Sequence, residues 1–465
     1  MARPKDSDNR FDFRGGVNLT HTDDTLSASE LRRARNGRTD LSAGISKRLG
    51  SKRLHTVALG GPVLGSFQWD APGGRQLVAI AGGTLWYRNG TAGEFTAGPS
   101  GFSTTRAPSF ATHRQGSDIV LFIADGALRR WTGLALTGVP GAPAAVWICT
   151  YKNRLFALDG SKRLYWSALF NPLDWTVSES LGGFADVENY DTEPLAGAIR
   201  CGDSLVLFKA DNVSRYTGSR PESVNIDTGT EGISDEVGLA APGTLVGFEH
   251  SYFFVADEGP HVGDDAAIQD VGGKLAGLWK RVNRAALSTA VAAHAQDRKE
   301  VWLALPVDGS AAPNEVWAFN YPLGAWYGPW DMAGASLAEY TRADGTETVL
   351  RGGTDGFLRE EDTGVRDDVL AAGTGGLLIA WEVDLPPLLF GDPARTKHLK
   401  GKVQNIAAAV GADGSLEVAW STEKGTGGVT LPGRGGGTQD YLFKINAKGR
   451  RVQITLREAT AAAVE

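Results

Sequence analysis

The residues best suited to chemistry lie in one short stretch, RLYWSALFNPLDW, at positions 163–175. Trp166 and Trp175 lie on either side of an Asn-Pro turn, and Asp174 directly precedes the second tryptophan. An indole offers a large flat apolar face that could stack on a sugar ring. A carboxylic acid can protonate the oxygen of a glycosidic bond. The stretch therefore fits either a sugar-binding platform beside a catalytic acid or one corner of a structural pattern.

A glycosidase needs a second carboxyl group facing the first at about 5 Å or about 6.5–9.5 Å, and the sequence gives no partner for Asp174. Carboxylates gather in DVENYDTE (186–193) and REEDTGVRDD (359–368), but neither stretch has the DxDxDG order of a calcium loop. Solvated loop charge is the better interpretation of both.

Other patterns that mark active sites are missing from the sequence. GRGGGT (433–438) lacks the lysine and the following helix of a phosphate-binding loop. There is no G-x-S-x-G elbow, and the seven histidines and two cysteines show no metal-ligand spacing. We therefore predict no catalytic residue, no metal site and no cofactor.

The composition favours a chain of many short strands joined by tight turns. Glycine makes up 61 of 465 residues, about 13 %, which is roughly twice its usual share. Glycine adopts positive φ without steric cost, as tight turns require. No apolar run of ~18 residues occurs and the N-terminus has no apolar core, so neither a membrane span nor a secretory signal is predicted. We expect a soluble protein made in the cytosol.

A repeat of about 45 residues runs from position 57 to about 360. Each unit has an apolar strand, a turn rich in Gly, Asp or Asn, and a second strand that ends in an aromatic or histidine, as in SDIVLFIADGALRRWTG. The closing residues are Trp86, Trp131, Trp166, Tyr216, His261, Trp317 and Phe357, spaced by 45, 35, 50, 45, 56 and 40 residues. Such a period is typical of a β-propeller. We predict an all-β protein whose propeller has about six blades, although five or seven also fit the spacing.

The chain divides into three parts on this pattern. Residues 1–53 are predicted to form an extended docking arm, in which Ser27 and Glu30 have the spacing of a capping box and predict a short helix. Residues 54–362 are assigned to the propeller. Residues 363–465 read as a small antiparallel β-sandwich, because RRVQITLR places Val452, Ile454 and Leu456 on one side of a strand.

Charge is unevenly distributed between the arm and the rest of the chain. The arm has 12 Lys/Arg against 7 Asp/Glu, a local charge of +5, whereas the remainder has 35 against 47, a charge of −12. A basic arm on an acidic body predicts docking to a partner surface or contact with phosphates; the plainer alternative is a solvated terminus. The candidate docking residues are Arg10, Arg14, Arg32, Arg33, Arg35 and Arg38.

The tryptophans have two possible uses. Thirteen occur in the chain, and stacking on sugars competes with packing between neighbouring blades, where each indole buries a large area. We favour packing. The candidate blade and interface aromatics are Trp86, Trp131, Trp166, Trp175, Trp317 and Trp326.

Several stretches, taken in order, resemble the β-propeller tail proteins of short-tailed bacteriophages, which form the tail nozzle or packaged-DNA-stabilising hub. The resemblance begins with RFDFRGGVNLTHTDDTLSASELRRARNGRTD and continues through RLYWSALFNPLDWT, CGDSLVLFKADNVSRYTG and SYFFVADEGPHV. It ends with WAFNYPLGAWYGPW, GGTDGFLREEDTGVRDD and FGDPARTKHLKGKV, and it covers roughly residues 10–405.

The resemblance implies a structural role in a virion tail assembled in the cytoplasm of a bacterial host. It implies a homo-oligomeric ring, a hexamer in this family, that extends and closes the DNA channel below the portal and adaptor. The partners would be the tail adaptor, portal-associated and other tail proteins, and double-stranded DNA passing without sequence-specific binding. Two alternatives remain: a carbohydrate-binding or glycan-cleaving propeller, such as a receptor-binding protein, and a scaffold in a host protein complex.

Overall fold

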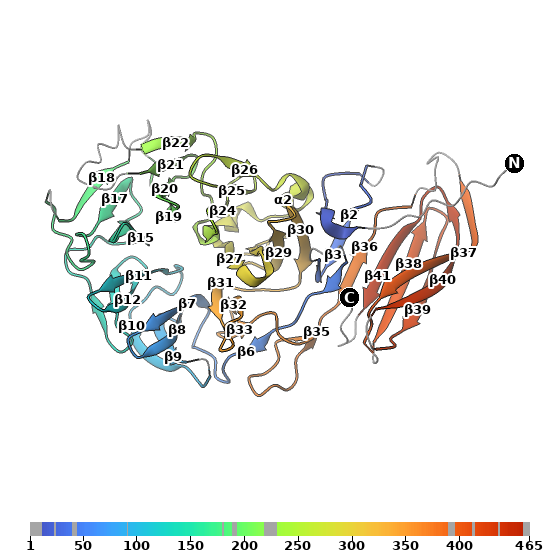
Figure 1. Cartoon of the computed structure of the whole chain (residues 1–465), viewed down its shortest axis with the longest axis horizontal. Coiled ribbons are helices and arrows are strands. Elements are labelled where there is room, and N and C mark those ends of the chain that lie inside the picture. The colour runs from blue at the N-terminus through green and yellow to red at the C-terminus, as the bar shows by residue number, and fades with distance from the viewer. Residues whose placement is uncertain are drawn as a thin grey trace.

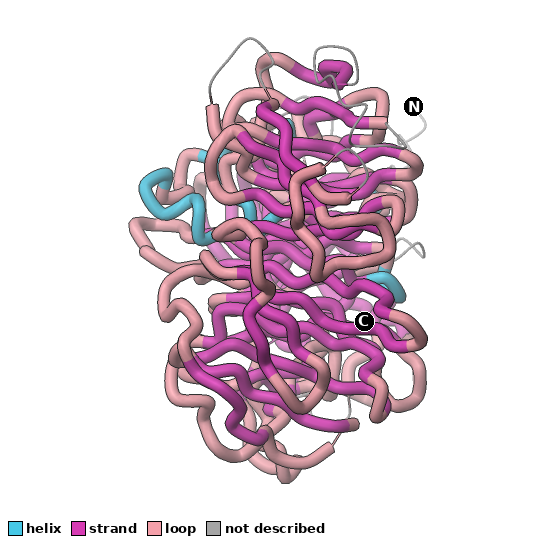
Figure 2. The backbone as a smooth tube through the Cα atoms, turned by 90° about the vertical axis from the view of Figure 1, so that its left-hand side faces the viewer, coloured by secondary structure: helices cyan, strands magenta, loops and turns pink. Residues whose placement is uncertain are grey.

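The chain is an all-β protein in which a ring of small sheets lies beside a β-sandwich (Figure 1). Figure 2 shows that strands dominate the backbone and that the helical segments are short. The structure, a computed structural model, describes residues 12–22, 25–39, 44–90, 92–178, 181–187, 193–217, 230–388, 396–411, 414–435 and 438–458.

Seven four-stranded antiparallel sheets occur in the described part of the chain. The first three are β7 (Val63–Ala71), β8 (Gly74–Ala81), β9 (Thr84–Asn89) and β10 (Thr96–Ser100); β11 (Ser109–Gln115), β12 (Asp118–Ala124), β13 (Leu128–Trp131) and β14 (Leu136–Gly138); and β15 (Trp147–Tyr151), β16 (Arg154–Leu158), β17 (Arg163–Trp166) and β18 (Gly183–Asp186).

The remaining four sheets follow in chain order. They are β19 (Gly197–Cys201), β20 (Ser204–Phe208), β21 (Val213–Tyr216) and β22 (Thr230–Ser234); β23 (Val246–Phe248), β24 (Ser251–Val255), β25 (Pro260–Gly263) and β26 (Ile268–Asp270); β27 (Val291–Ala295), β28 (Glu300–Leu305), β29 (Glu315–Asn320) and β30 (Ala325–Trp330); and β31 (Ser336–Thr341), β32 (Glu347–Gly352), β33 (Leu358–Glu360) and β6 (Lys52–Arg53).

These sheets are the blades of a β-propeller, which confirms the predicted fold class. The first strand of each blade lies at the axis and contacts the first strands of its neighbours, and β31 of the last blade contacts β7 of the first. The ring is therefore closed (Figure 1). It has seven blades where the sequence favoured about six.

The last blade explains the difference in blade number. Its outer strand β6 comes from the N-terminal segment, with Arg53 opposite Arg359 and Lys52 opposite Glu360. Residues 336–362 therefore supply only three of the four strands, and a seventh complete unit cannot be read along the chain. Each of the seven closing residues lies in, or directly before, the third strand of a different blade.

The propeller core consists of seven apolar clusters, one at each interface between neighbouring blades. The cluster between the first two blades, for example, packs Trp69 and Ile80 against Leu121 and Trp131. One cluster is larger than the others: from the interface between the fifth and sixth blades it continues through the N-terminal segment into the C-terminal sandwich. The two parts of the molecule thus share a core.

The C-terminal part is the predicted antiparallel sandwich. A sheet in the order β3-β36-β41-β38-β39 faces a pair β37-β40, with bounds β3 (Arg33–Arg35), β36 (Trp381–Asp384), β37 (Lys397–Ala408), β38 (Ser415–Thr422), β39 (Gly425–Pro432), β40 (Gln439–Gly449) and β41 (Gln453–Glu458). Val452, Ile454 and Leu456 are buried together, as the alternation predicted. One strand of the sandwich, β3, comes from the arm and pairs with β36.

The arm is folded into the molecule by short strands. Besides β3 and β6 it forms β1 (Gly16–Val17), β2 (Glu30–Leu31), β4 (Gly37–Arg38) and β5 (Ser46–Lys47), where β1 pairs with β2 and β4 with β5. The prediction of an extended arm is wrong for these residues.

The predicted helix after Ser27 is also wrong. The carboxylate of Glu30 does accept the backbone N–H of Ser27, as in a capping box, at 3.2 Å. It is also buried and accepts a hydrogen bond from Asn18 at 2.9 Å, while Leu31 is fully buried in the shared core. Tertiary contacts have thus overridden a local helix signal and placed both residues in β2.

Two tryptophans at equivalent places in neighbouring blades test this packing. Trp131 is fully buried and donates its indole N–H to Gln76 at 2.6 Å, whereas Trp86 is half-buried. We expect Trp131→Ala to lower the free energy of unfolding by about 3–5 kcal/mol, and Trp86→Ala by clearly less. Denaturant unfolding of both variants measures this, and equal losses would contradict the assigned interface.

Candidate functional site

The Trp166–Trp175 stretch forms a corner of the third blade rather than an open platform. Trp175 is 7 % exposed and packs in the cluster between the second and third blades, with its indole N–H donating to the carbonyl of Pro172 at 3.0 Å. Trp166 is 6 % exposed and packs towards the fourth blade. The indoles of both tryptophans are therefore buried against other parts of the protein.

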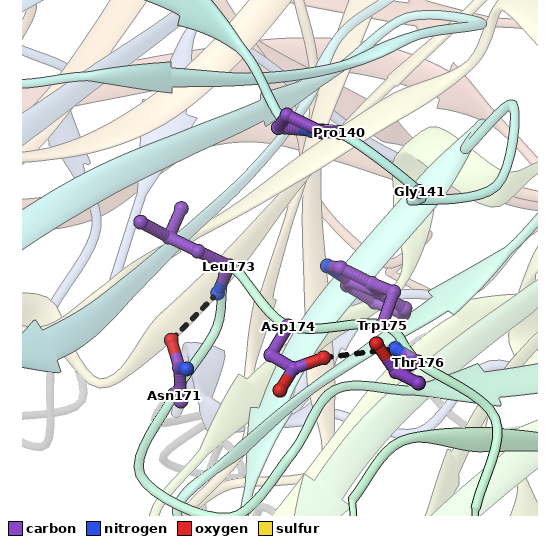
Figure 3. A pocket seen from close by; sticks show the side chains of 7 residues that line it. All are labelled: Pro140, Gly141, Asn171, Leu173, Asp174, Trp175 and Thr176. Atoms are coloured by element: carbon purple, nitrogen blue, oxygen red, sulfur yellow. Dashed lines mark hydrogen bonds between the residues drawn. The ribbon is translucent and has the colours of Figure 1, made fainter.

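A cavity of about 530 Å³ lies at this corner, lined by Asn171, Asp174, Trp175 and four further residues (Figure 3). Asp174 accepts the backbone N–H of Thr176 at 3.0 Å, and this bond, together with the Thr176 hydroxyl, lowers the pKa of Asp174. A general acid needs the opposite shift, towards neutral pH. Asp174 therefore caps a turn, which agrees with the structural interpretation.

The carboxylates of 359–368 are used in ion pairs. Glu361 pairs with Arg351 at 2.7 Å, Asp367 with Arg48, and Asp368 with both Arg53 and Arg359. In the second acidic stretch Asp186 pairs with Arg163, while 188–192 lie outside the described residues. No group of three or more His, Cys, Asp or Glu residues with metal-binding geometry occurs in the ranges that the structure describes.

Of the five candidate arginines that the structure describes, Arg33, Arg35 and Arg38 contact residues beyond the arm. Arg14 pairs with Asp12, Arg33 with Glu382 and Arg35 with Asp331, and Arg32 donates to the carbonyl of His21. Arg10 lies outside the described residues. Arg33 and Arg35 thus have carboxylate partners outside the arm, which reduces the positive charge that the arm presents.

Arg38 makes the most enclosed of these contacts. Its guanidinium is 7 % exposed and donates to Glu300 at 2.9 Å and to Asp362 at 2.8 Å. It also lies over the rings of Trp302 and Trp330, with 5.5 Å and 5.1 Å from its central carbon to the ring centroids. Arg38 therefore joins the arm to the sixth blade and to the chain beyond the seventh.

The electrostatics of this cluster favour the charged forms of Arg38 and Asp362 in spite of burial, whereas burial prevails at Glu300. Burial acts to lower the pKa of Arg38, but the charges of Asp362 and Glu300 outweigh it and raise that pKa. Burial likewise acts against ionised Asp362, yet Arg38 and Arg298 hold its pKa below the usual range. Glu300 has its pKa raised by burial and is held by a further hydrogen bond from the Trp302 indole at 2.9 Å.

The other candidate aromatics lie where blades meet. Trp131, Trp317 and Trp326 are buried, and the indole of Trp326 donates to the carbonyl of Val271 on the fifth blade at 2.7 Å. Trp86 is half-buried against the cluster between the last and first blades. In the described residues none of the six candidate tryptophans presents an exposed ring.

The sequence missed a cavity that lies on the propeller axis and has a volume of about 1250 Å³. Its wall is made by the first strands of the blades and the segments before them, and its carboxylates are Glu339 and Glu347 on adjacent strands of one blade. Each blade contributes only a few residues, so no single stretch of sequence indicates the cavity. The two carboxylates share one wall, unlike a glycosidase pair that faces across its substrate.

Comparisons with known proteins give similarity in fold alone. No protein-family model and no curated protein matches the sequence. Similar solved structures include the WD40 β-propeller domain of Doa1 (TM-score 0.41, 7 % identity, covering 67 % of this chain and 96 % of that chain) and a chain of the mitotic checkpoint complex (0.44, 11 %, 68 % and 93 %). A third is YCF48 bound to D1 peptide (0.40, 12 %, 68 % and 97 %).

Among the described residues, no helix has the length and apolar character needed to cross a membrane.

The buried arginine gives a direct test of the arm contacts. We expect Arg38→Met to cost about 3–5 kcal/mol of unfolding free energy, because Glu300 and Asp362 lose their buried partner. The control is Arg35→Met, whose ion pair with Asp331 is partly exposed and should be worth less than about 1 kcal/mol. Equal unfolding midpoints for the two variants in urea would contradict the role given to Arg38.

Proposed function

We propose that the protein is a structural component of a bacteriophage tail, a nozzle or hub in which several copies form a ring that extends and closes the DNA channel. The ring would assemble in the host cytoplasm against the tail adaptor and portal-associated proteins. Six copies is the number that the family resemblance implies. The proposal includes no catalytic step.

One observation carries the proposal. Stretches that resemble the tail proteins, although far apart in sequence, meet at one joint between the propeller and the sandwich. Trp330 of AWYGPW donates its indole N–H to the carbonyl of Gly37 at 2.8 Å, and Asn36 donates its amide to Asp331 at 2.8 Å. Arg38 reaches Asp362 of REEDTGVRDD. Stretches that occur in this order along the chain thus contact one another in one structural unit, which supports the resemblance to the tail proteins.

The charge distribution also fits a channel component. Outside the arm the chain has a net charge of −12, and the arm arginines described above are mostly paired internally. A wall rich in unpaired Lys and Arg would bind phosphates and slow the passage of DNA. An acidic wall does not bind phosphates and so does not slow the DNA in this way.

Two groups of exposed apolar side chains offer surfaces for contacts between copies. One is on the third blade (Leu169, Phe170, Val177 and Phe184), and the other is around β34 (Arg366–Asp367) and β35 (Leu377–Leu378) (Val365, Leu370, Leu377 and Leu378). The third blade and β35 lie on opposite sides of the propeller ring in Figure 1. A ring needs two different surfaces that meet head to tail, and exposed apolar groups mark such surfaces.

Negative-stain microscopy of the purified protein, alone and with its adaptor, tests the proposal. We expect rings of about six copies, as implied by the resemblance, and we expect Phe170→Asp and Leu377→Asp each to reduce ring formation. The matched control is Leu134→Asp, because Leu134 is 81 % exposed and belongs to neither group. Melting temperatures of all variants should stay close to that of the parent protein.

A monomer that stays monomeric with the adaptor, or that binds or cleaves oligosaccharides, would overturn the proposal in favour of the glycan alternative.

A further inference from the structure

The axial cavity is largely apolar along its length. Its lining includes Leu64, Phe67, Phe110, Trp147 and Leu337, and the rings of Phe67 and Phe110 stack at 5.5 Å between centroids. Water inside an apolar cavity forms few hydrogen bonds with the wall, so an apolar ligand gains by displacing it. At about 1250 Å³ the cavity is larger than the roughly 300–1,000 Å³ typical of a drug-sized ligand.

The wall also presents edges of β-strands that have no partner strand, although side chains of neighbouring blades already bond some of their backbone groups, as Gln68 does at Thr341 and Ser109 at Ile148. The first strand of each blade, from β7 to β31, is the terminal strand of its sheet in the described structure, so its axis-facing edge has no partner strand. Such edges can pair with the backbone of an added extended segment. A lipid or another hydrocarbon ligand could not use these donors and acceptors, whereas a peptide could.

The two ends of the cavity differ in charge. Glu339 lies near the end of β31, and Glu347 begins β32 opposite Thr341. Gln68 hydrogen-bonds with the backbone of Thr341 in both directions, at 2.8 and 3.0 Å, so β7 reaches the same level.

The opposite end of the cavity carries a positive charge. Arg106 lines the cavity just before β11 begins, and Pro108 beside it packs against Gly65 near the start of β7. The acidic end therefore suits a cation, and the apolar wall with its glutamates disfavours a polyanion such as single-stranded nucleic acid.

His294 is the neighbour of Glu339 at the acidic end. Its Nδ1 lies 3.6 Å from Glu339, and its Nε2 lies 3.4 Å from the hydroxyl of Tyr321. Glu339 itself is 63 % exposed in its side chain, which leaves its carboxylate within reach of a ligand.

We propose that the axial cavity binds an extended, mainly apolar peptide segment of a partner protein, with a lysine or arginine placed beside Glu339 and Glu347. The segment pairs with the first strand of one or more blades and packs its side chains against the apolar wall. Since β11 has 7 residues and a strand rises about 3.3 Å per residue, a segment of about six to eight residues spans the cavity. This inference is independent of the proposed tail function.

Fluorescence anisotropy with short peptides tests the proposal on the full-length protein. The probe is a fluorescein-labelled, end-capped octapeptide of one lysine followed by leucine, valine and threonine residues. Comparison peptides replace the lysine by glutamine or by glutamate, or carry N-methyl groups on alternate amides. A single-stranded oligonucleotide with the same label serves as the competing class of ligand.

We expect the lysine peptide to bind best, the glutamate peptide worst, and the N-methylated peptide much more weakly than its parent. The double variant Glu339→Gln/Glu347→Gln should weaken binding of the lysine peptide by about fivefold and leave the glutamine peptide unchanged. Glu417→Gln, at an exposed strand position in the sandwich, is the matched control and should change nothing.

Three results would each overturn the proposal: no binding of any peptide, equal binding of the N-methylated peptide, or a double variant that binds the lysine peptide like the control. Tight binding of the oligonucleotide in place of the peptides would do the same. Both glutamates are at the surface of the cavity, so the double variant is expected to fold normally.

Discussion

The buried contact of Arg38 with Glu300 and Asp362 is the interaction on which the joint between propeller and sandwich depends. Three charged groups at low exposure are stable there only because each satisfies the others and two indoles cover the guanidinium. Lys47 and Glu458 form a second buried pair at 2.7 Å, between the arm and the last strand of the sandwich. Together these pairs fix a specific arrangement that apolar packing alone would leave less defined.

The arm therefore has a structural role that its composition did not indicate. By adding β6 it completes the last blade, and by adding β3 to the C-terminal sheet it completes the sandwich edge. The residues that pair in this way are about 300 or more positions apart in the chain. Closing loops of this length costs entropy before the contacts are gained, which slows folding. The arm thus joins the propeller to the sandwich in addition to the core that the two parts share.

The sequence predicted what depends on local patterns. Short alternating strands and a period near 45 residues indicated a propeller, and alternation in RRVQITLR identified a buried strand face. The sequence could not predict features that depend on distant partners. Nothing near Arg38 indicates that Glu300 will neutralise it, and the capping-box spacing at Ser27 does not reveal that Leu31 is buried in a shared core. The axial cavity was missed for the same reason, because its wall is assembled from seven separate strands.

Hydrogen–deuterium exchange of the arm measures most directly whether it is an internal joint. The amides of Asn36, Arg48, Ser51, Arg53 and Leu54 donate to the carbonyls of Pro329, Asn36, Arg366, Val369 and Leu358, respectively, at 2.8–3.0 Å. We expect these amides to exchange as slowly as those of the central blade strands, because they open only when the joint opens. Exchange at the rate of an unstructured peptide would show instead a free basic tail and would contradict the internal role of the arm.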